Sequence, residues 1–163
     1  MNNWLTRQIF AGFIYSFVLI VNAEVLVGKV VAVSDGDTIT VLDKNKTKHK
    51  VRLMGIDAPE IRQEFGAQSK LALSNHIYQK EVNVNYKKFD KYKRIVGKVN
   101  LEKQDVSLVM IELGMASHYK DYEKEQSKAD RDLYRQAELK SRQAKIGLWQ
   151  DENAIEPSAF RHK

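Results

Sequence analysis

The sequence predicts an α+β domain built mainly from β-strands, on two observations. Short segments rich in valine and isoleucine are separated by turn residues, which is typical of antiparallel strands. One segment of helical period interrupts these strands, and further helical segments follow the last of them. Five strands with about three helices fit a closed five-stranded barrel of the OB type, with the helices against its outside. A mixed open sheet is the alternative.

The first three predicted strands form a meander. Residues 25–33 and 39–42 are the first two strands, and Asp35-Gly36 between them is a strong hairpin signal. A polar turn then leads into a third strand at residues 48–56. Because antiparallel strands can be joined by short turns, we expect these neighbours to pair in that way.

The remaining strands and the first two helices follow from the same kinds of pattern. Apolar residues recur at helical spacing over residues 65–78. Two further strands, at residues 81–86 and 95–101, are separated by a charged turn. Asp105 is a suitable N-cap for a short second helix, and Gly114 is a suitable left-handed end for it.

A third, highly charged helix is predicted for residues 122–146. Its apolar stripe is thin and consists of Ala129, Leu133, Ala137 and Ala144. We therefore place the folded domain at residues 24–150. The polar tail at residues 151–163 is expected to fray.

The first 23 residues resemble a secretory signal peptide. Arg7 supplies a positive charge, an apolar run of 13 residues spans 9–21, and small residues precede Glu24. A membrane-spanning helix needs about 20 apolar residues, so the run is short for that purpose. We expect a secreted or periplasmic protein with no stable membrane association after cleavage; an uncleaved membrane anchor is the alternative.

Charge and cysteine content restrict the partners. The chain has a formal net charge of +6, and removal of Arg7 with the predicted signal peptide would lower it to +5. A basic exported domain attracts polyanions, either nucleic acid or an anionic membrane surface. The chain has no cysteine, which excludes disulfides, lipoprotein anchoring and thiolate metal sites.

The strongest functional signal is a pair of acidic turns. Asp35-Gly36-Asp37 lies in the first hairpin, and Asp57-Ala58-Pro59-Glu60 follows the third strand, which also carries Arg52. Each turn alone is most often an ordinary loop. Together they supply the oxygen ligands that a hard cation such as Ca²⁺ prefers, and an arginine suited to binding phosphate. The combination indicates a nuclease.

Four segments resemble the thermonuclease family, also called staphylococcal or micrococcal nucleases. They are residues 33–38 (VSDGDT), 51–60 (VRLMGIDAPE), 90–94 (DKYKR) and 145–149 (KIGLW), and they occur in the order of the family. The resemblance covers nearly all of the chain from Val25 to Trp149. It implies an OB-fold, calcium-dependent phosphodiesterase that cuts DNA and RNA and leaves 3′-phosphates.

The resemblance also implies roles for individual residues. Asp37 and Asp57 would bind Ca²⁺ with the backbone carbonyl of Ala58, and Asp35 would support this site from behind. Glu60 would activate the attacking water. Arg52 and Arg94 would hold the scissile phosphate, and Tyr119 or Tyr122 would contact the nucleotide. The residue types suit the chemistry, since in-line attack on a phosphodiester builds negative charge that a cation and guanidinium groups stabilise.

Two departures from the family pattern and one geometric conflict concern this site. Lys93 stands where the family usually has glycine, and a positive φ there would be strained. Residues 61–65 form a shorter loop than in the secreted prototype. Strict alternation along the third strand places Arg52 and Asp57 on opposite faces, so both reach one site only if the strand twists or bulges, plausibly at Gly55.

Two other classes of function compete with a monomeric nuclease. An OB-fold module that has lost catalysis could bind nucleic acid by charge and stacking. The complete set of Asp37, Arg52, Asp57, Glu60 and Arg94 argues against it, because a binding module has no need for acids beside phosphate. A membrane-surface protein is disfavoured, since no basic amphipathic helix with a broad apolar face is present in the sequence.

Overall fold

The computed structural model describes residues 24–151 and 153–161. The predicted signal peptide lies outside the described residues. Within the described part of the chain, no helix is both long and apolar enough to cross a membrane.

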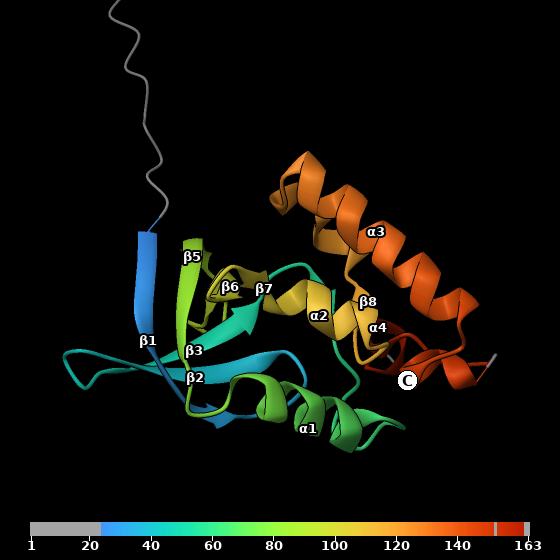
Figure 1. Ribbon diagram of the computed structural model, residues 1–163, viewed down its shortest axis with the longest axis horizontal. Helices are drawn as coiled ribbons and strands as arrows, with labels where there is room; N and C mark the ends of the chain where they lie inside the picture. Colours follow the sequence, from blue (N-terminus) through green and yellow to red (C-terminus); the bar gives the residue numbers. More distant parts are fainter. Residues whose placement is uncertain (1–23, 152, 162–163) are drawn as a thin grey trace, which may run out of the picture.

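Five strands form a closed barrel, as predicted (Figure 1). They are β1 (Glu24–Val33), β2 (Thr38–Asp43), β3 (Lys48–Leu53), β5 (Glu81–Phe89) and β6 (Ile95–Leu101). They pair in the order β3-β2-β1-β5-β6, and parallel pairing of β3 with β6 closes the ring. The fold is an OB-type α+β fold, and the alternative of a mixed open sheet is excluded.

The barrel interior is filled by the β-branched residues that define the strands in the sequence. In β5, Val82 and Val84 are buried while their neighbours are exposed, as the period of two requires. Val30 of β1, Ile39 of β2 and Val51 of β3 are fully buried in the same core. The barrel is therefore a packed scaffold, and function must lie at its rim.

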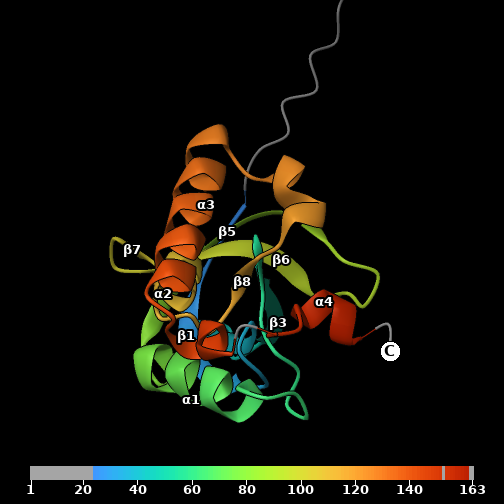
Figure 2. The same ribbon diagram turned by 90° about the vertical axis from the view of Figure 1, so that its right-hand side faces the viewer.

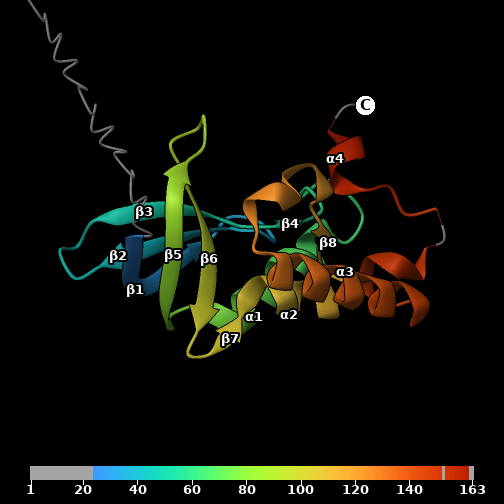
Figure 3. The ribbon, with the colours of Figure 1, turned by 90° about the horizontal axis from the view of Figure 1, so that it is seen from above.

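Helices cover one end and one side of this barrel (Figures 1 and 3). α1 (Gly66–Ile77) contacts β1, α2 (Val106–Glu112) contacts β6, and α3 (Lys128–Gln143) packs on α2. The side chain of Asp105 accepts hydrogen bonds from the backbone N–H groups of Ser107 and Leu108, which confirms the predicted N-cap. The described residues also contain three short helices: η1 (Lys120–Glu125), η2 (Gly147–Gln150) and α4 (Pro157–Phe160).

The predicted third strand is shorter than expected. β3 ends at Leu53, a turn follows, and β4 (Ile56–Asp57) leaves the barrel to pair with β8 (Ser117–His118). Gly55 makes this turn with a φ of 79°, a left-handed conformation that glycine adopts without strain. A further short strand, β7 (Gln104–Asp105), extends the sheet beside β6.

The predicted helix at residues 122–146 is wrong in two respects. The segment divides into η1 and α3, because buried Gln126 bonds His118 and Ser127 then caps α3 by accepting from the Asp130 N–H. The buried face of α3 consists of Tyr134, Ala137, Glu138 and Ser141, so only Ala137 of the predicted apolar stripe is buried.

The tail also differs from the expectation that it frays, since several of its residues contact the domain. The side-chain amide of Gln63 donates to the carbonyl of Ile155 at 2.7 Å, and Pro157 at the start of α4 is buried. Figures 2 and 3 place α4 on the same side of the molecule as the turn between β5 and β6.

Candidate active site

A cleft of about 640 Å³ lies where β3, the β5–β6 turn and the end of the chain meet. Nearly all sequence-predicted site residues line it: Asp35, Asp37, Arg52, Ala58, Glu60, Arg94, Tyr119 and Tyr122. Asp57 lies just beneath the cleft surface, with 1% of its area exposed. The structure therefore gathers the whole predicted set in one place.

Arg52 joins the two aspartates that are expected to bind metal. Its Nη1 lies 2.9 Å from Asp37 Oδ2, and its Nη2 lies 3.1 Å from Asp57 Oδ1. The guanidinium also donates to the carbonyl of Ile56 at 2.8 Å. These contacts fix the arginine at the floor of the cleft, with 13% of its side chain exposed.

Strict alternation along the strand would place Arg52 and Asp57 on opposite faces, and the turn at Gly55 brings them to the same side. Because the backbone reverses there, Asp57 returns toward the side chain of Arg52 instead of pointing away from it. A Cβ at Gly55 would lie 2.3 Å from Nε2 of Gln126, so the Gln126 side chain would have to shift to admit one. The strand turns where a bulge or twist was expected.

Asp35 supports Asp37 through the backbone of their shared turn. The N–H of Asp37 donates to Asp35 Oδ1 at 3.0 Å, and the hydroxyl of Thr38 donates to Asp37 Oδ1 at 2.9 Å. Burial, together with the neighbouring charge of Asp37, raises the pKa of Asp35 to about 6. Negative charge is therefore crowded at this end of the cleft.

Asp37 also binds the loop that carries the second acidic turn. The N–H of Ala58 donates to Asp37 Oδ2 at 2.9 Å across the gap between the two turns. Gly36 lets its turn pack closely against α1 and the Ala58 loop. A Cβ at Gly36 would lie 1.8 Å from the hydroxyl of Ser69 in α1 and 2.7 Å from the Cβ of Ala58. The resemblance implies that the carbonyl of Ala58 binds the metal. The observed contact of Ala58 with Asp37 is made by its N–H instead.

Asp57 is surrounded by positive charge. Burial raises the pKa of its carboxyl, and the guanidinium groups of Arg161 and Arg52 counter that effect. Arg161 donates from Nη2 to both Asp57 oxygens, at 3.0 Å and 2.9 Å, and from Nη1 to Glu60 Oε1 at 3.0 Å. Sequence reasoning missed Arg161, because no local pattern connects the polar tail with residues about a hundred positions earlier.

Glu60 lies at the mouth of the cleft with 43% of its side chain exposed. Its backbone N–H donates to the side chain of Gln63, and this bond stabilises the loop that follows Pro59. The carboxylate can therefore reach a water molecule in the cleft while the backbone beneath it is fixed.

Arg94 lines the cleft despite the strain expected before it. Lys93 has a φ of 61°, so the left-handed conformation is present at a residue with a side chain. Asp90 compensates, because its carboxylate accepts from the Arg94 N–H at 2.9 Å and from Arg94 Nε at 2.7 Å. Arg94 Nη1 also lies 3.3 Å from the hydroxyl of Thr38, next to Asp37.

Tyr119 and Tyr122 form an aromatic wall. Their ring centroids are 4.9 Å apart, the guanidinium of Arg52 lies 6.0 Å from the Tyr119 ring, and Lys88 Nζ lies 5.7 Å from the Tyr122 ring. Burial, with the charge of Asp57, raises the pKa of the Tyr119 phenol. Flat rings beside cations can stack on bases and approach phosphates.

The oxygen donors fit a hard cation only in part. Asp37 and Asp57 lie on two sides of the Arg52 fork and offer the carboxylates that Ca²⁺ prefers. Across residues 24–151 and 153–161, no three His, Cys, Asp or Glu side chains converge into a group that could hold a metal ion. A cation held by the two aspartates would need water or backbone carbonyls for its other positions.

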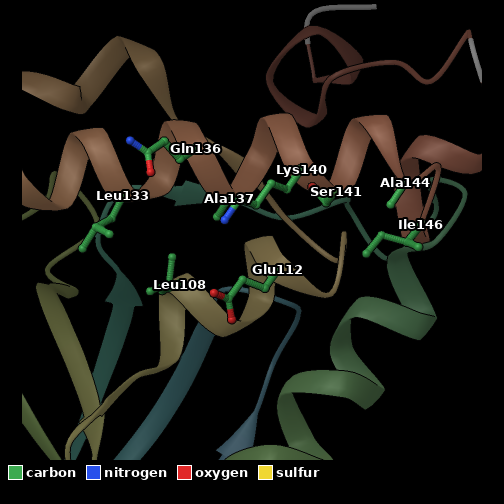
Figure 4. A pocket seen from close by; sticks show the side chains of 9 residues that line it. All are labelled: Leu108, Glu112, Leu133, Gln136, Ala137, Lys140, Ser141, Ala144 and Ile146. Carbon is green, nitrogen blue, oxygen red and sulfur yellow. The ribbon is translucent and has the colours of Figure 1, made fainter.

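A second hollow lies between α2 and α3 (Figure 4). It has a volume of about 310 Å³, and of the nine residues that line it only Glu112 and Lys140 are charged. It lacks the cluster of acids and arginines that phosphodiester chemistry needs. The cleft beside Arg52 is therefore the candidate active site.

Comparison with known proteins agrees with this geometry. Residues 50–151 match the family described as "Staphylococcal nuclease homologue". The chain belongs to this family. The match includes Arg52, Asp57, Glu60 and Arg94, which lie around the cleft.

Relatives of the staphylococcal nuclease family extend the likeness over most of the chain. An "Uncharacterized endonuclease" of Haemophilus influenzae is 44% identical over 135 residues, which cover 83% of this chain and 72% of the relative. A "Micrococcal nuclease" of Shigella flexneri is 37% identical over 143 residues, which cover 82% of this chain and 79% of the relative. The family and these relatives support nuclease activity.

Proposed function

We propose that this protein is an exported, calcium-dependent nuclease that hydrolyses phosphodiester bonds of DNA and RNA and leaves 3′-phosphates. One observation carries the proposal: Arg52 binds both Asp37 and Asp57 at the floor of a cleft whose rim holds Glu60 and Arg94. Acids that bind a cation and arginines that bind phosphate thus share one site. The chain's resemblance to thermonucleases supports the choice of metal and product.

Each residue of the site has a separate task in this proposal. Asp37 and Asp57 would hold the cation, and the Ala58 carbonyl and water would supply further ligands. Bound there, Ca²⁺ would stabilise the negative charge that develops on the non-bridging phosphate oxygens. Glu60 accepts the proton of the attacking water, which it can do because its carboxylate is exposed to the cleft.

Arg52 and Arg94 orient the scissile phosphate between them. Arginine suits this task because its planar group binds two oxygens at once and stays charged. Tyr119 and Tyr122 then position the neighbouring nucleotide by stacking. The basic character of the chain attracts the polyanion to the cleft.

Incubation of the purified protein with plasmid DNA and with RNA tests the proposal. Cleavage of both is expected in Ca²⁺, with little in Mg²⁺, whose stricter octahedral geometry a two-carboxylate site satisfies poorly. Chelator should abolish cleavage. Binding of DNA without cleavage in Ca²⁺ would favour the inactive OB-fold binding module, and full activity in chelator would exclude the metal.

Export rests on the signal-like residues 1–23 and is tested separately. The intact mass of the protein recovered from the periplasm or medium should correspond to a chain that begins at Glu24. Recovery of Met1 to Ala23 still attached would contradict this part of the proposal.

A further inference from the structure

The end of the chain brings a third guanidinium into the candidate active site. Arg161 contacts both oxygens of Asp57 and one oxygen of Glu60, each at about 3 Å. It therefore bridges the expected metal ligand and the expected base. Burial acts to lower the pKa of Arg161, but its bonds to Glu60 and the charge of Asp57 outweigh this and raise it.

Contacts along the tail hold Arg161 in this position. Gln63 donates to the carbonyl of Ile155 at 2.7 Å, which fixes the tail to the loop that follows Glu60. Arg142 of α3 pairs with Glu156, and Pro157 is buried. Figure 2 shows α4 on the same side of the molecule as the turn between β5 and β6. The tail is anchored before it reaches the acids.

Arg161 occupies positions that a metal ion would need. Asp57 is 1% exposed, and Arg161 donates to both of its oxygens. A divalent cation at Asp57 must bind these same oxygens, and it would repel a guanidinium at hydrogen-bond distance. One of the two arginines at Asp57 must then withdraw.

Arg161 is the arginine that can withdraw. Arg52 is only 13% exposed and is held by Asp37, Asp57 and the Ile56 carbonyl. The Arg161 side chain is 34% exposed, and its hydrogen bonds go to the side chains of Asp57, Glu60 and Tyr119 at the cleft surface. It lies at the end of a tail and can turn toward solvent without disturbing the barrel.

We propose that Arg161 is a tethered cation that pairs with Asp57 and Glu60 in the metal-free protein and competes with a hard divalent cation for them. This inference rests on the proposed metal site at Asp57. Arg161 would then neutralise the charges of Asp57 and Glu60 until the metal concentration is high enough to displace it. Metal binding and tail docking then oppose each other.

Calorimetric titration of Ca²⁺ into the full chain tests the competition without measuring cleavage. Arg161→Ala should bind Ca²⁺ about tenfold more tightly than wild type, the equivalent of about 1.4 kcal/mol. Arg62→Ala is the matched control, since it removes the same charge from an exposed arginine in the loop after Glu60.

Hydrogen exchange gives a second readout. Addition of Ca²⁺ to wild type should increase exchange of the Phe160 and Arg161 amides in the last turn of α4, because Arg161 is released from the acids while Gln63 and Arg142 still hold the tail before it. In Arg161→Ala the Phe160 amide should exchange quickly with or without Ca²⁺. Slower or unchanged exchange of these wild-type amides in Ca²⁺ would contradict the proposal.

The Ca²⁺ affinities of the variants can also contradict the proposal. The proposal is overturned if Arg161→Ala and Arg62→Ala bind Ca²⁺ equally, if Arg161→Ala binds more weakly, or if none of the proteins binds it. Slower cleavage by Arg161→Ala with unchanged Ca²⁺ affinity would make Arg161 a phosphate-binding residue instead. Tighter Ca²⁺ binding by a protein that never cleaves nucleic acid would uphold the competition and refute only the nuclease function.

Discussion

Arg52 binds Asp57, five positions later in the chain, across a single turn, with 3.1 Å between Nη2 and Oδ1. The contact exists because Gly55 reverses the backbone after β3. The same guanidinium reaches Asp37 on the neighbouring turn. One glycine thus determines whether the two acids and the arginine form a single site.

Gly55→Ala should disrupt both stability and the site. A φ of 79° costs a residue with a side chain about 1–2 kcal/mol, and contact with Gln126 adds to this cost. The free energy of unfolding, measured by denaturant titration, should fall by at least that amount. Lys44→Ala, in the exposed β2–β3 turn, is the control and should change it by less than about 0.5 kcal/mol.

Lys93→Gly should act in the opposite direction. Lys93 has a φ of 61°, and glycine removes this strain at a smaller entropic cost, so stability should rise by up to about 1 kcal/mol. Cleavage should be retained because Asp90 holds Arg94. Lys91→Gly in the same turn has no positive φ to relieve and should destabilise the protein. Equal effects of the two substitutions would show that the backbone at Lys93 is not strained.

Arg52 should contribute to both stability and catalysis, and two substitutions separate these effects. Arg52→Ala removes one of the two arginine partners of buried Asp57 and should lower both stability and the cleavage rate, the rate by about a hundredfold. Arg52→Lys keeps the charge but loses the fork, so stability should largely return while the rate stays low. Full activity in the lysine variant would show that Arg52 serves only as a positive charge that stabilises the fold.

Tyr134 provides a test of stability that does not involve the cleft. Its hydroxyl donates to Asp105 at 2.8 Å, so Tyr134→Phe should lower the free energy of unfolding by about 1.5–3 kcal/mol without changing the cleavage rate per folded molecule.

The same bond predicts a dependence on pH. Burial, with the charge of Asp105, raises the pKa of Tyr134, so its stabilisation is complete below the ordinary tyrosine pKa of about 10 and is lost as pH rises above it. The stability difference between wild type and Tyr134→Phe should therefore narrow above about pH 10. A difference that stays constant to higher pH would contradict the raised pKa.

Local signals predicted most of the barrel because they depend on neighbouring residues. A few neighbouring residues suffice to form each of these features: the alternating valines of β5, the hairpin at Asp35-Gly36 and the N-cap at Asp105. The gathering of Asp37, Arg52 and Asp57 could be expected from two turns at neighbouring strand ends.

Long-range contacts account for what the sequence did not predict. The helix predicted at residues 122–146 is interrupted because Gln126 bonds buried His118, a partner that helical periodicity cannot reveal. Leu133 is half-exposed while Glu138 is buried beside Lys120 and Arg142, so charge pairing overrides the apolar stripe. Arg161 lies 104 positions from Asp57, and only the folded chain brings them together.

In the proposed function, this cleft hydrolyses phosphodiesters, and Glu60 accepts the proton from the attacking water. Glu60→Gln keeps the shape of the side chain and, at a position that is 43% exposed, should leave the fold intact. The most direct measurement is the single-turnover rate of DNA cleavage in saturating Ca²⁺ for wild type and Glu60→Gln. If Glu60 accepts this proton, the rate should be about 10²–10⁴-fold lower in the variant, with similar DNA affinity. Rates within a few fold of each other would contradict this role of Glu60.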